Sequence, residues 1–180
     1  MKPFAILAIL LSIAGCAVID NNLCTSDAII TSYSPTKIYV HNEKKVVLIG
    51  GCFDVLHYPH IDFMKKAREQ GDYLVIALEP DEKIINNKKR QPIHTQQQRA
   101  HNLAAIRYVD EVLMLSPLNG FSEYNQLVKD IHPDIIAVTR NNPGLKNMQK
   151  QAAEIGAQVV IVNDLTDDFS SSKIIKALSD

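Results

Sequence analysis

The chain has 180 residues, which is enough for one α/β domain with a sizeable core and few for two. Its 19 Lys and Arg nearly balance 20 Asp and Glu, so the formal net charge of −1 excludes the basic surface typical of nucleic-acid binding. The three cysteines, Cys16, Cys24 and Cys52, lack the spacing of a metal site. We expect no structural disulfide, unless the beginning of the chain is exported and Cys16 pairs with Cys24.

Residues 1–20 form an apolar segment of the signal or anchor type. Positions 4–19 are almost wholly apolar and follow Lys2, and this run is shorter than the roughly 20 residues that span a membrane. The sequence LSIAGC at 11–16 resembles a bacterial lipoprotein cleavage box, in which Cys16 would be lipidated. Three interpretations stay open: an exported lipoprotein, an uncleaved membrane tether, and a start codon assigned too early.

Residues 21–44 are polar and indicate a linker with one short strand at 37–40. A regular alternation of strands and helices follows over 45–180, which predicts one domain with a parallel sheet covered by helices on both faces. We expect Gly71 and Gly156 to end helices, and Thr95 with Gln98 to begin one as a capping box. The predicted strands are 46–50, 73–78, 111–115, 134–138 and 158–162, and the predicted helices are 60–70, 81–85, 95–107, 122–131, 145–155 and 170–178.

The stretch GGCFDVLHYPH at 50–60 joins the first of these strands to the first helix. Unpaired N–H groups and the macrodipole make a helix start suited to an anion such as phosphate. His57 and His60 lie three residues apart, so both side chains face the same side of that helix start. A Gly-Gly turn, an Asp and paired histidines together indicate a polyphosphate site, because glycines let a ligand approach the backbone.

This stretch resembles the G-x-F-D-x-x-H-x-G-H signature of the cytidylyltransferase-like nucleotidyltransferases. That family includes glycerol-3-phosphate cytidylyltransferase, the adenylyltransferase of ADP-heptose synthesis and archaeal-type FAD synthetase. The resemblance covers residues 45–180 and implies a Rossmann-like, doubly wound parallel sheet of five strands in the order 3-2-1-4-5. It also implies a cytoplasmic catalytic domain that uses Mg²⁺ and a nucleoside triphosphate, and a homodimer.

The resemblance assigns roles to further residues. His57 and His60 would stabilise charge on the triphosphate, Lys88 would contact phosphates, and Arg99 in the block 90–99 would make a bidentate phosphate contact. Asp54 would orient the loop or cap the helix, and Asp81 would lie near the acceptor. The nucleotide-binding residues implied are Gly50, Gly51, Cys52, Phe53, Asp54, Arg140, Ser170, Ser171 and Ser172.

The sequence departs from the signature at one position, where Pro59 stands in place of glycine. Proline is well tolerated in the first turn of a helix, but it lacks an N–H that could face a ligand. We therefore expect transfer of AMP, or of CMP, from a nucleoside triphosphate to a sugar or polyol phosphate, with release of pyrophosphate. The alternative is a nucleotide-binding module without catalysis, for which a membrane tether through residues 1–20 is one of the open interpretations. An arginine that cytidylyltransferases often carry upstream of 170 is absent, which favours ATP.

Overall fold

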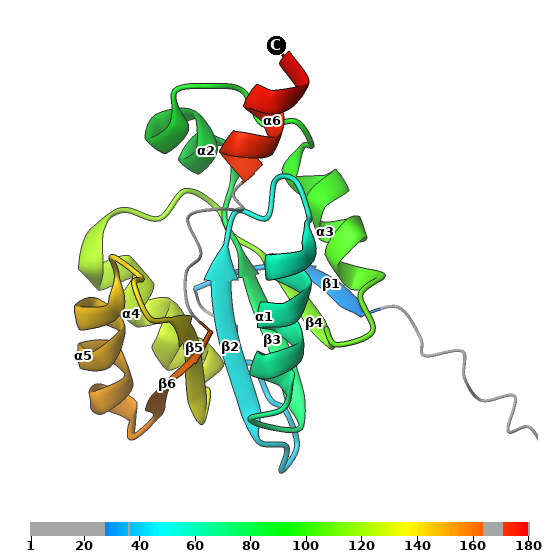
Figure 1. Cartoon of the computed structure of the whole chain (residues 1–180). Coiled ribbons are helices and arrows are strands. Elements are labelled where there is room, and N and C mark those ends of the chain that lie inside the picture. Colours follow the sequence, from blue (N-terminus) through cyan, green and yellow to red (C-terminus); the bar gives the residue numbers. More distant parts are fainter. Residues whose placement is uncertain (1–27, 36, 164–170, 180) are drawn as a thin grey trace, which may run out of the picture.

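The computed structural model describes residues 28–35, 37–163 and 171–179 (Figure 1). Within them lies one sheet of six parallel strands, in the order β1-β4-β3-β2-β5-β6. The strands are β1 (Ile29–Ser32), β2 (Val46–Gly51), β3 (Tyr73–Leu78), β4 (Glu111–Met114), β5 (Ile135–Thr139) and β6 (Gln158–Asn163). The helices are α1 (Tyr58–Arg68), α2 (Asp81–Lys88), α3 (Gln96–Ala104), α4 (Gly120–Ile131), α5 (Leu145–Ile155) and α6 (Ser171–Ser179).

The Rossmann-like class is confirmed, and β4-β3-β2-β5-β6 has the order expected for the five predicted strands. One element differs: β1 lies at 29–32 inside the predicted linker, and it pairs with β4 at the edge of the sheet. The strand predicted at 37–40 is wrong, because this segment has no ladder partner. Its side chains nevertheless alternate, with Ile38 and Val40 at 82% and 72% exposure and Tyr39 buried.

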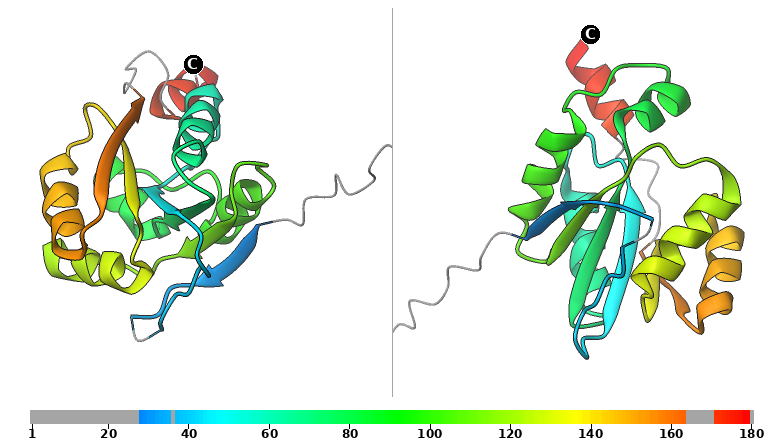
Figure 2. Two further views of the ribbon diagram at one scale, coloured as in Figure 1. Left: turned by 90° about the horizontal axis from the view of Figure 1, so that it is seen from below. Right: turned by 180° about the vertical axis from the view of Figure 1, so that it is seen from behind.

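The sheet separates two apolar cores, and each face is covered by its own pair of helices (Figure 2). Helices α1 and α3 pack on one face through Met64 and Leu103. Helices α4 and α5 pack on the other face through Val128 and Ala152. Both faces of the central strands are therefore dry, as in other parallel sheets, and this explains why β2 and β3 are continuous apolar runs.

Several predicted helix ends are confirmed, and one is wrong. The capping box of Thr95 and Gln98 begins α3, and Gly156 ends α5 with a φ of 76°. Gly71, by contrast, does not cap α1, which ends at Arg68. A Cβ at position 71 would lie 2.5 Å from the carbonyl oxygen of Lys45, so close backbone packing explains this glycine.

Strand β2 lies between β3 and β5, so the chain winds outward from it in both directions. The carboxyl ends of β2 and β5 mark the point where the strand order reverses, which is where ligands bind in such sheets. Figure 1 shows α2 and α6 beyond these ends, on the side where the 50–60 stretch lies. Among the described helices, none is long and apolar enough to cross a membrane. Residues 1–20, with Cys16, and Ser170 lie outside the described ranges.

Candidate functional site

The loop between β2 and α1 is held in shape by a glycine and a phenylalanine. Phe53 is buried and has a φ of 46°, a conformation that is uncommon for a bulky residue. Its ring leaves no space for a side chain at Gly51, where a Cβ would lie 2.9 Å from Phe53 Cε2. Glycine at 51 and the unusual backbone of Phe53 therefore form one unit, which turns the chain towards α1.

The two histidines are in contact at the start of α1. His57 is the N-cap residue, and its Nδ1 lies 3.0 Å from the carbonyl oxygen of Val55. The His57 and His60 ring centroids are 4.0 Å apart, with the rings close to perpendicular. The other neighbour of His60 is Phe53, whose ring centroid is 5.2 Å away. The structure thus brings together the two residues predicted to grip a triphosphate.

His60 is an uncharged imidazole at neutral pH. Burial is the main reason why its pKa falls from 6.5 to about 4, electrostatic interactions with His57 and Lys88 add to this lowering, and a hydrogen bond to the Val55 carbonyl oxygen opposes these effects. Its Nδ1 is buried and has no hydrogen-bond partner among the described residues. A buried polar atom without a partner costs free energy, so this nitrogen is a natural contact point for a ligand.

Two predicted residues approach this pair from other elements. Lys88 ends α2 and is exposed, and its charge acts on both His60 and Cys52. Ser171 begins α6, and its hydroxyl donates to the carbonyl oxygen of Val55 over 3.2 Å. The start of α6 therefore lies against the loop that carries the paired histidines, although Ser171 and Val55 are 116 positions apart in the sequence.

Asp54 is turned away from solvent and holds the segment that precedes α3. Its Oδ1 accepts from the backbone N–H groups of Ile93 (2.8 Å) and His94 (3.1 Å), and its Oδ2 accepts from Arg90 Nη1 (2.6 Å). Burial alone would raise the pKa of Asp54, but these hydrogen bonds outweigh it and hold the pKa below its usual value. Of the two predicted roles, the structure places Asp54 in loop orientation and gives no helix cap.

Arg99, predicted to make a bidentate phosphate contact, is fully buried, and its guanidinium group contacts protein atoms. Its Nη1 donates to the carbonyl oxygen of Cys52, its Nε to that of His94, and its Nη2 pairs with Asp81 over 2.7 Å. Arg99 thus ties α3, the 50–60 loop and α2 together. Asp81, predicted to lie near the acceptor, is neutralised by this contact.

Arg140 follows β5, on the far side of the strand-order reversal from β3. Its backbone N–H donates to the carbonyl oxygen of Asn163 over 2.9 Å, which joins the ends of β5 and β6. Gly50 is exposed at the end of β2, and Ser172 is exposed on α6. These residues share the carboxyl edge of the sheet with the histidines.

Sequence reasoning missed a polar cluster at the end of β3. Glu79 accepts from the Tyr124 hydroxyl with both oxygens, at 2.9 and 3.0 Å, and Lys83 donates to the same hydroxyl over 3.1 Å. Glu79 immediately follows the buried strand β3, and a charged residue at the carboxyl end of a parallel strand is a signal in the sequence for a functional position. Tyr124 lies 45 positions away on α4, and no local pattern connects the two.

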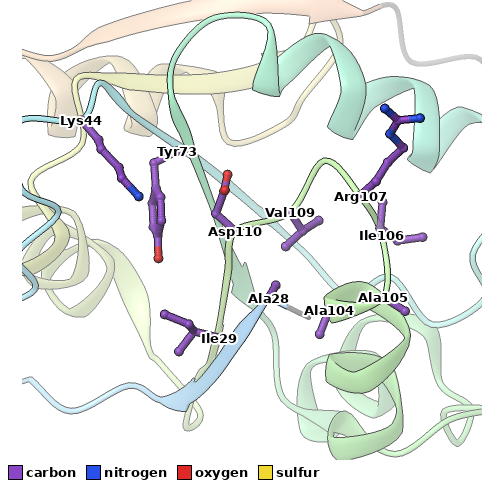
Figure 3. A pocket seen from close by; sticks show the side chains of 10 residues that line it. All are labelled: Ala28, Ile29, Lys44, Tyr73, Ala104, Ala105, Ile106, Arg107, Val109 and Asp110. Atoms are coloured by element: carbon purple, nitrogen blue, oxygen red, sulfur yellow. The ribbon is translucent and has the colours of Figure 1, made fainter. Parts of the chain in front are cut away.

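A cavity of about 390 Å³ lies at the opposite end of the sheet, near the amino ends of β1 and β3 (Figure 3). Lys44 lies over the ring of Tyr73 at 4.4 Å, and Asp110 is paired with Arg68 over 3.0 Å. The charges around it thus have protein partners, and the paired histidines lie elsewhere. Its lining residues are Ala28, Ile29, Lys44, Tyr73, Ala104, Ala105, Ile106, Arg107, Val109 and Asp110.

The family described as Cytidylyltransferase-like matches residues 48–177, which is more than half of the chain. The chain belongs to the cytidylyltransferase-like family. The matched region includes the histidine pair, Asp54, Lys88 and the start of α6, and it begins just before the 50–60 signature from which the family was anticipated. The family resemblance expected from the sequence is therefore confirmed.

Curated relatives of this cytidylyltransferase-like chain include nucleotidyltransferases of more than one kind. It is 41% identical over 143 residues to an FAD synthase of Thermococcus kodakarensis, spanning 75% of this chain and 93% of the relative. An FAD synthase of Pyrococcus abyssi is 35% identical over 144 residues, 77% of this chain and 95% of the relative. The bifunctional protein HldE of Campylobacter jejuni is 33% identical over 143 residues, 77% of this chain but 29% of that longer protein.

Solved structures support the fold. A lipopolysaccharide core biosynthesis protein from Thermoplasma volcanium matches 68% of this chain and 99% of its own, with a TM-score of 0.57 and 23% identity. Pantoate-beta-alanine ligase from Francisella tularensis matches 84% of this chain and 77% of its own, with a TM-score of 0.55 and 14% identity. At these identities the likeness speaks for the architecture alone.

Proposed function

We propose that this domain transfers AMP, or CMP, from a nucleoside triphosphate to a phosphorylated small molecule and releases pyrophosphate. The observation that carries the proposal is the contact between His57 and His60 at the start of α1, where the strand order reverses. The start of α6 lies against the same loop through Ser171. Two helix starts and a pair of imidazoles offer N–H donors to a polyphosphate from two directions.

The proposed reaction needs positioning and charge stabilisation, with no nucleophile from the protein. An oxygen of the acceptor phosphate attacks the α-phosphorus, and the bond to the leaving pyrophosphate breaks. A neutral imidazole has one N–H, and the Val55 carbonyl oxygen accepts a hydrogen bond from both His57 and His60, so each ring would donate to an oxygen of the bound triphosphate through its second nitrogen as an imidazolium. Lys88, whose charge already acts on His60, would offset negative charge as pyrophosphate departs.

Mg²⁺ is part of the proposal. Among the described residues, no three His, Cys, Asp or Glu side chains gather into a metal site. Mg²⁺ commonly binds through substrate phosphates with one or two carboxylates, so the chain's donors fit an ion that arrives with the triphosphate. When bound, the ion would neutralise phosphate charge and favour departure of pyrophosphate.

The names of the relatives support a proposal about the substrates. The two relatives named FAD synthase are matched over 93% and 95% of their own length, and FAD is FMN joined to AMP. FMN with ATP is therefore the first acceptor pair that we propose, and sugar or polyol phosphates, as expected from the sequence, are the next. CTP stays in the comparison because no described contact selects a base.

The test measures pyrophosphate release by the full chain with Mg²⁺. ATP and CTP are each combined with FMN, a sugar phosphate and glycerol 3-phosphate. We expect turnover with at least one pair, and loss of at least about a hundredfold in the His57→Ala and His60→Ala variants. Release by the wild type that does not exceed release by these variants would reject the enzyme assignment.

A second candidate function is nucleotide binding without transfer, and Pro59 motivates it. Pro59 is the second residue of α1, where the backbone N–H of another residue would point towards an anion. Because proline has no backbone N–H, the site proposed for the triphosphate lacks one hydrogen-bond donor. Thermal stabilisation by ATP, with no pyrophosphate from any acceptor, would favour this candidate over the first.

We further propose a cytoplasmic homodimer, because nucleoside triphosphates are a cytoplasmic resource and the family is commonly dimeric. A membrane tether through residues 1–20, or lipidation of Cys16 after export, remains the competing proposal. Mass spectrometry of the mature amino terminus shows whether the chain is cleaved and lipidated at Cys16 or keeps residues 1–20. Light scattering of the purified full chain measures the oligomeric state.

A further inference from the structure

Glu79, Tyr124 and Lys83 form a connected polar surface beside the proposed nucleotide site. The backbone N–H of Glu79 donates to the carbonyl oxygen of Gly51 over 3.0 Å, which fixes Glu79 next to the 50–60 loop. Both carboxylate oxygens then accept from Tyr124, at 2.9 and 3.0 Å. Lys83 donates to the Tyr124 hydroxyl over 3.1 Å, and its ammonium lies 5.1 Å from the ring centre.

The charge of Glu79 has no direct cation to balance it. Among the described residues it forms no ion pair, because Lys83 hydrogen-bonds the Tyr124 hydroxyl instead of the carboxylate, and the charges of Lys83 and Arg99 act on Glu79 only from a distance. Asp81, two residues later, is in contrast paired with Arg99. Burial raises the pKa of Glu79, and burial together with the charge of Glu79 raises the pKa of the Cys52 thiol.

Packing alone gives no reason for a carboxylate at this position. A half-buried negative charge without a paired cation reduces stability, and an uncharged side chain could accept the same Tyr124 hydrogen bond. Such costs are commonly retained where a group meets a ligand. The carboxylate also has spare capacity, because its two oxygens offer about four acceptor positions and share a single hydroxyl hydrogen, that of Tyr124.

We propose that Glu79, Tyr124 and Lys83 bind the acceptor of the transfer, an inference that rests on the proposed function. The Lys83 ammonium has three N–H donors, one of which is used by Tyr124, so it can take the acceptor phosphate. A phosphate would be repelled by Glu79, which instead accepts from a hydroxyl in the uncharged part of the acceptor. Asp81 is then a positioning residue that acts through Arg99.

This arrangement selects acceptors with a phosphate at one end and a hydroxylated chain next to it. Sugar phosphates, polyol phosphates and the ribityl phosphate of FMN share that chemistry. A site built to accept a substrate hydroxyl discriminates strongly against an analogue without it, because the carboxylate is left without its partner. Discrimination between a hydroxylated acceptor and its deoxy analogue is thus the signature of Glu79.

The experiment measures binding of acceptor and nucleotide separately to the full chain, by calorimetry. FMN, ribose 5-phosphate, 2-deoxyribose 5-phosphate and glycerol 3-phosphate are the acceptor probes, and ATP with Mg²⁺ is the nucleotide probe. For each hydroxylated acceptor probe that binds the wild type, we expect Glu79→Gln and Tyr124→Phe to lower the affinity by about tenfold or more. The affinity for ATP should change by less than about twofold. Lys83→Met should weaken the binding of every phosphorylated acceptor probe and leave ATP affinity unchanged. Glu82→Gln, an exposed carboxylate on the same helix, is the matched control and should change neither.

Three outcomes would overturn the inference: binding of none of the acceptor probes to the wild type, equal loss of acceptor and ATP affinity in Glu79→Gln, or no loss of either. Tyr124→Phe keeps the ring and its packing, so it tests the hydroxyl even where a change at Glu79 unfolds the chain. Acceptor binding that depends on Glu79, with no pyrophosphate from any pair, would sink the proposed transfer and leave the acceptor surface standing.

Discussion

The Nη2 atom of Arg99 lies 2.7 Å from Oδ1 of Asp81, and the two residues come from neighbouring helices. The same guanidinium donates to the carbonyl oxygens of Cys52 and His94, so one buried side chain joins three segments. The planar fork of arginine suits this task, since it presents donors in several fixed directions. The position of the 50–60 loop therefore depends on a residue of α3.

Removing this fork should destabilise the fold and loosen the loop. We expect Arg99→Met to lower the free energy of unfolding by about 3–5 kcal/mol, because it leaves the Asp81 carboxylate and two carbonyls without their donor. Arg99→Lys keeps the charge but not the fork, and its loss should be smaller. Urea denaturation measures both, with the exposed Arg107→Ala as the control. Equal stability of Arg99→Met and the wild type would contradict this role.

Asp54→Asn tests the contact between the 50–60 loop and the segment before α3. We expect a loss of about 1–3 kcal/mol, since Arg90 Nη1 would keep at best a weaker, uncharged acceptor. The native pKa of Asp54 lies below its ordinary value of 3.8, so its contribution is present above that pH and is lost as the pH falls through the native value. The difference between wild type and variant in acid denaturation should therefore shrink below about pH 4. A constant difference down to pH 2 would refute the charge-based explanation.

Local patterns carried most of the fold and part of the site. Apolar runs of strand length, the capping box at Thr95 and the glycine at 156 are signals within a few residues, and they located strands and helix ends closely. The histidine pair was predictable for the same reason, because a spacing of three residues places both rings at one helix start.

The remaining features depend on contacts between distant parts of the chain. Asp81 and Arg99 are both visible as charged residues near the signature, but the sequence does not reveal that they neutralise each other. The contact between Glu79 and Tyr124 likewise depends on how β3 and α4 pack. The edge strand β1 was missed because four residues carry little periodic signal and it pairs with a strand 82 positions later. Such pairings follow from topology, which periodicity alone does not give.

His60 should make stability depend on pH between about 6.5 and 4. Its native pKa is depressed to about 4, so the unfolded chain takes up the proton first and the native state loses stability as the pH falls through this range. The full loss is roughly 3 kcal/mol, since one pKa unit corresponds to about 1.4 kcal/mol. Urea denaturation at a series of pH values should show a smaller slope for His60→Asn than for the wild type. The exposed His101→Gln is the control, and an unchanged slope in His60→Asn would disprove burial of a neutral imidazole.

Restoring the family glycine at position 59 tests whether the missing backbone donor limits the site. Pro59→Gly returns an N–H to the first turn of α1, and we expect tighter ATP binding by about 10- to 100-fold, as for one hydrogen bond to a charged group. The variant should also unfold more easily by about 0.4–1 kcal/mol, because proline restricts the unfolded chain. Calorimetry with ATP and urea denaturation measure the two effects, and Pro117→Gly in an exposed loop is the matched control. Unchanged or weaker ATP binding would mean that this backbone position faces no phosphate, and that the proline at 59 does not explain any lack of turnover.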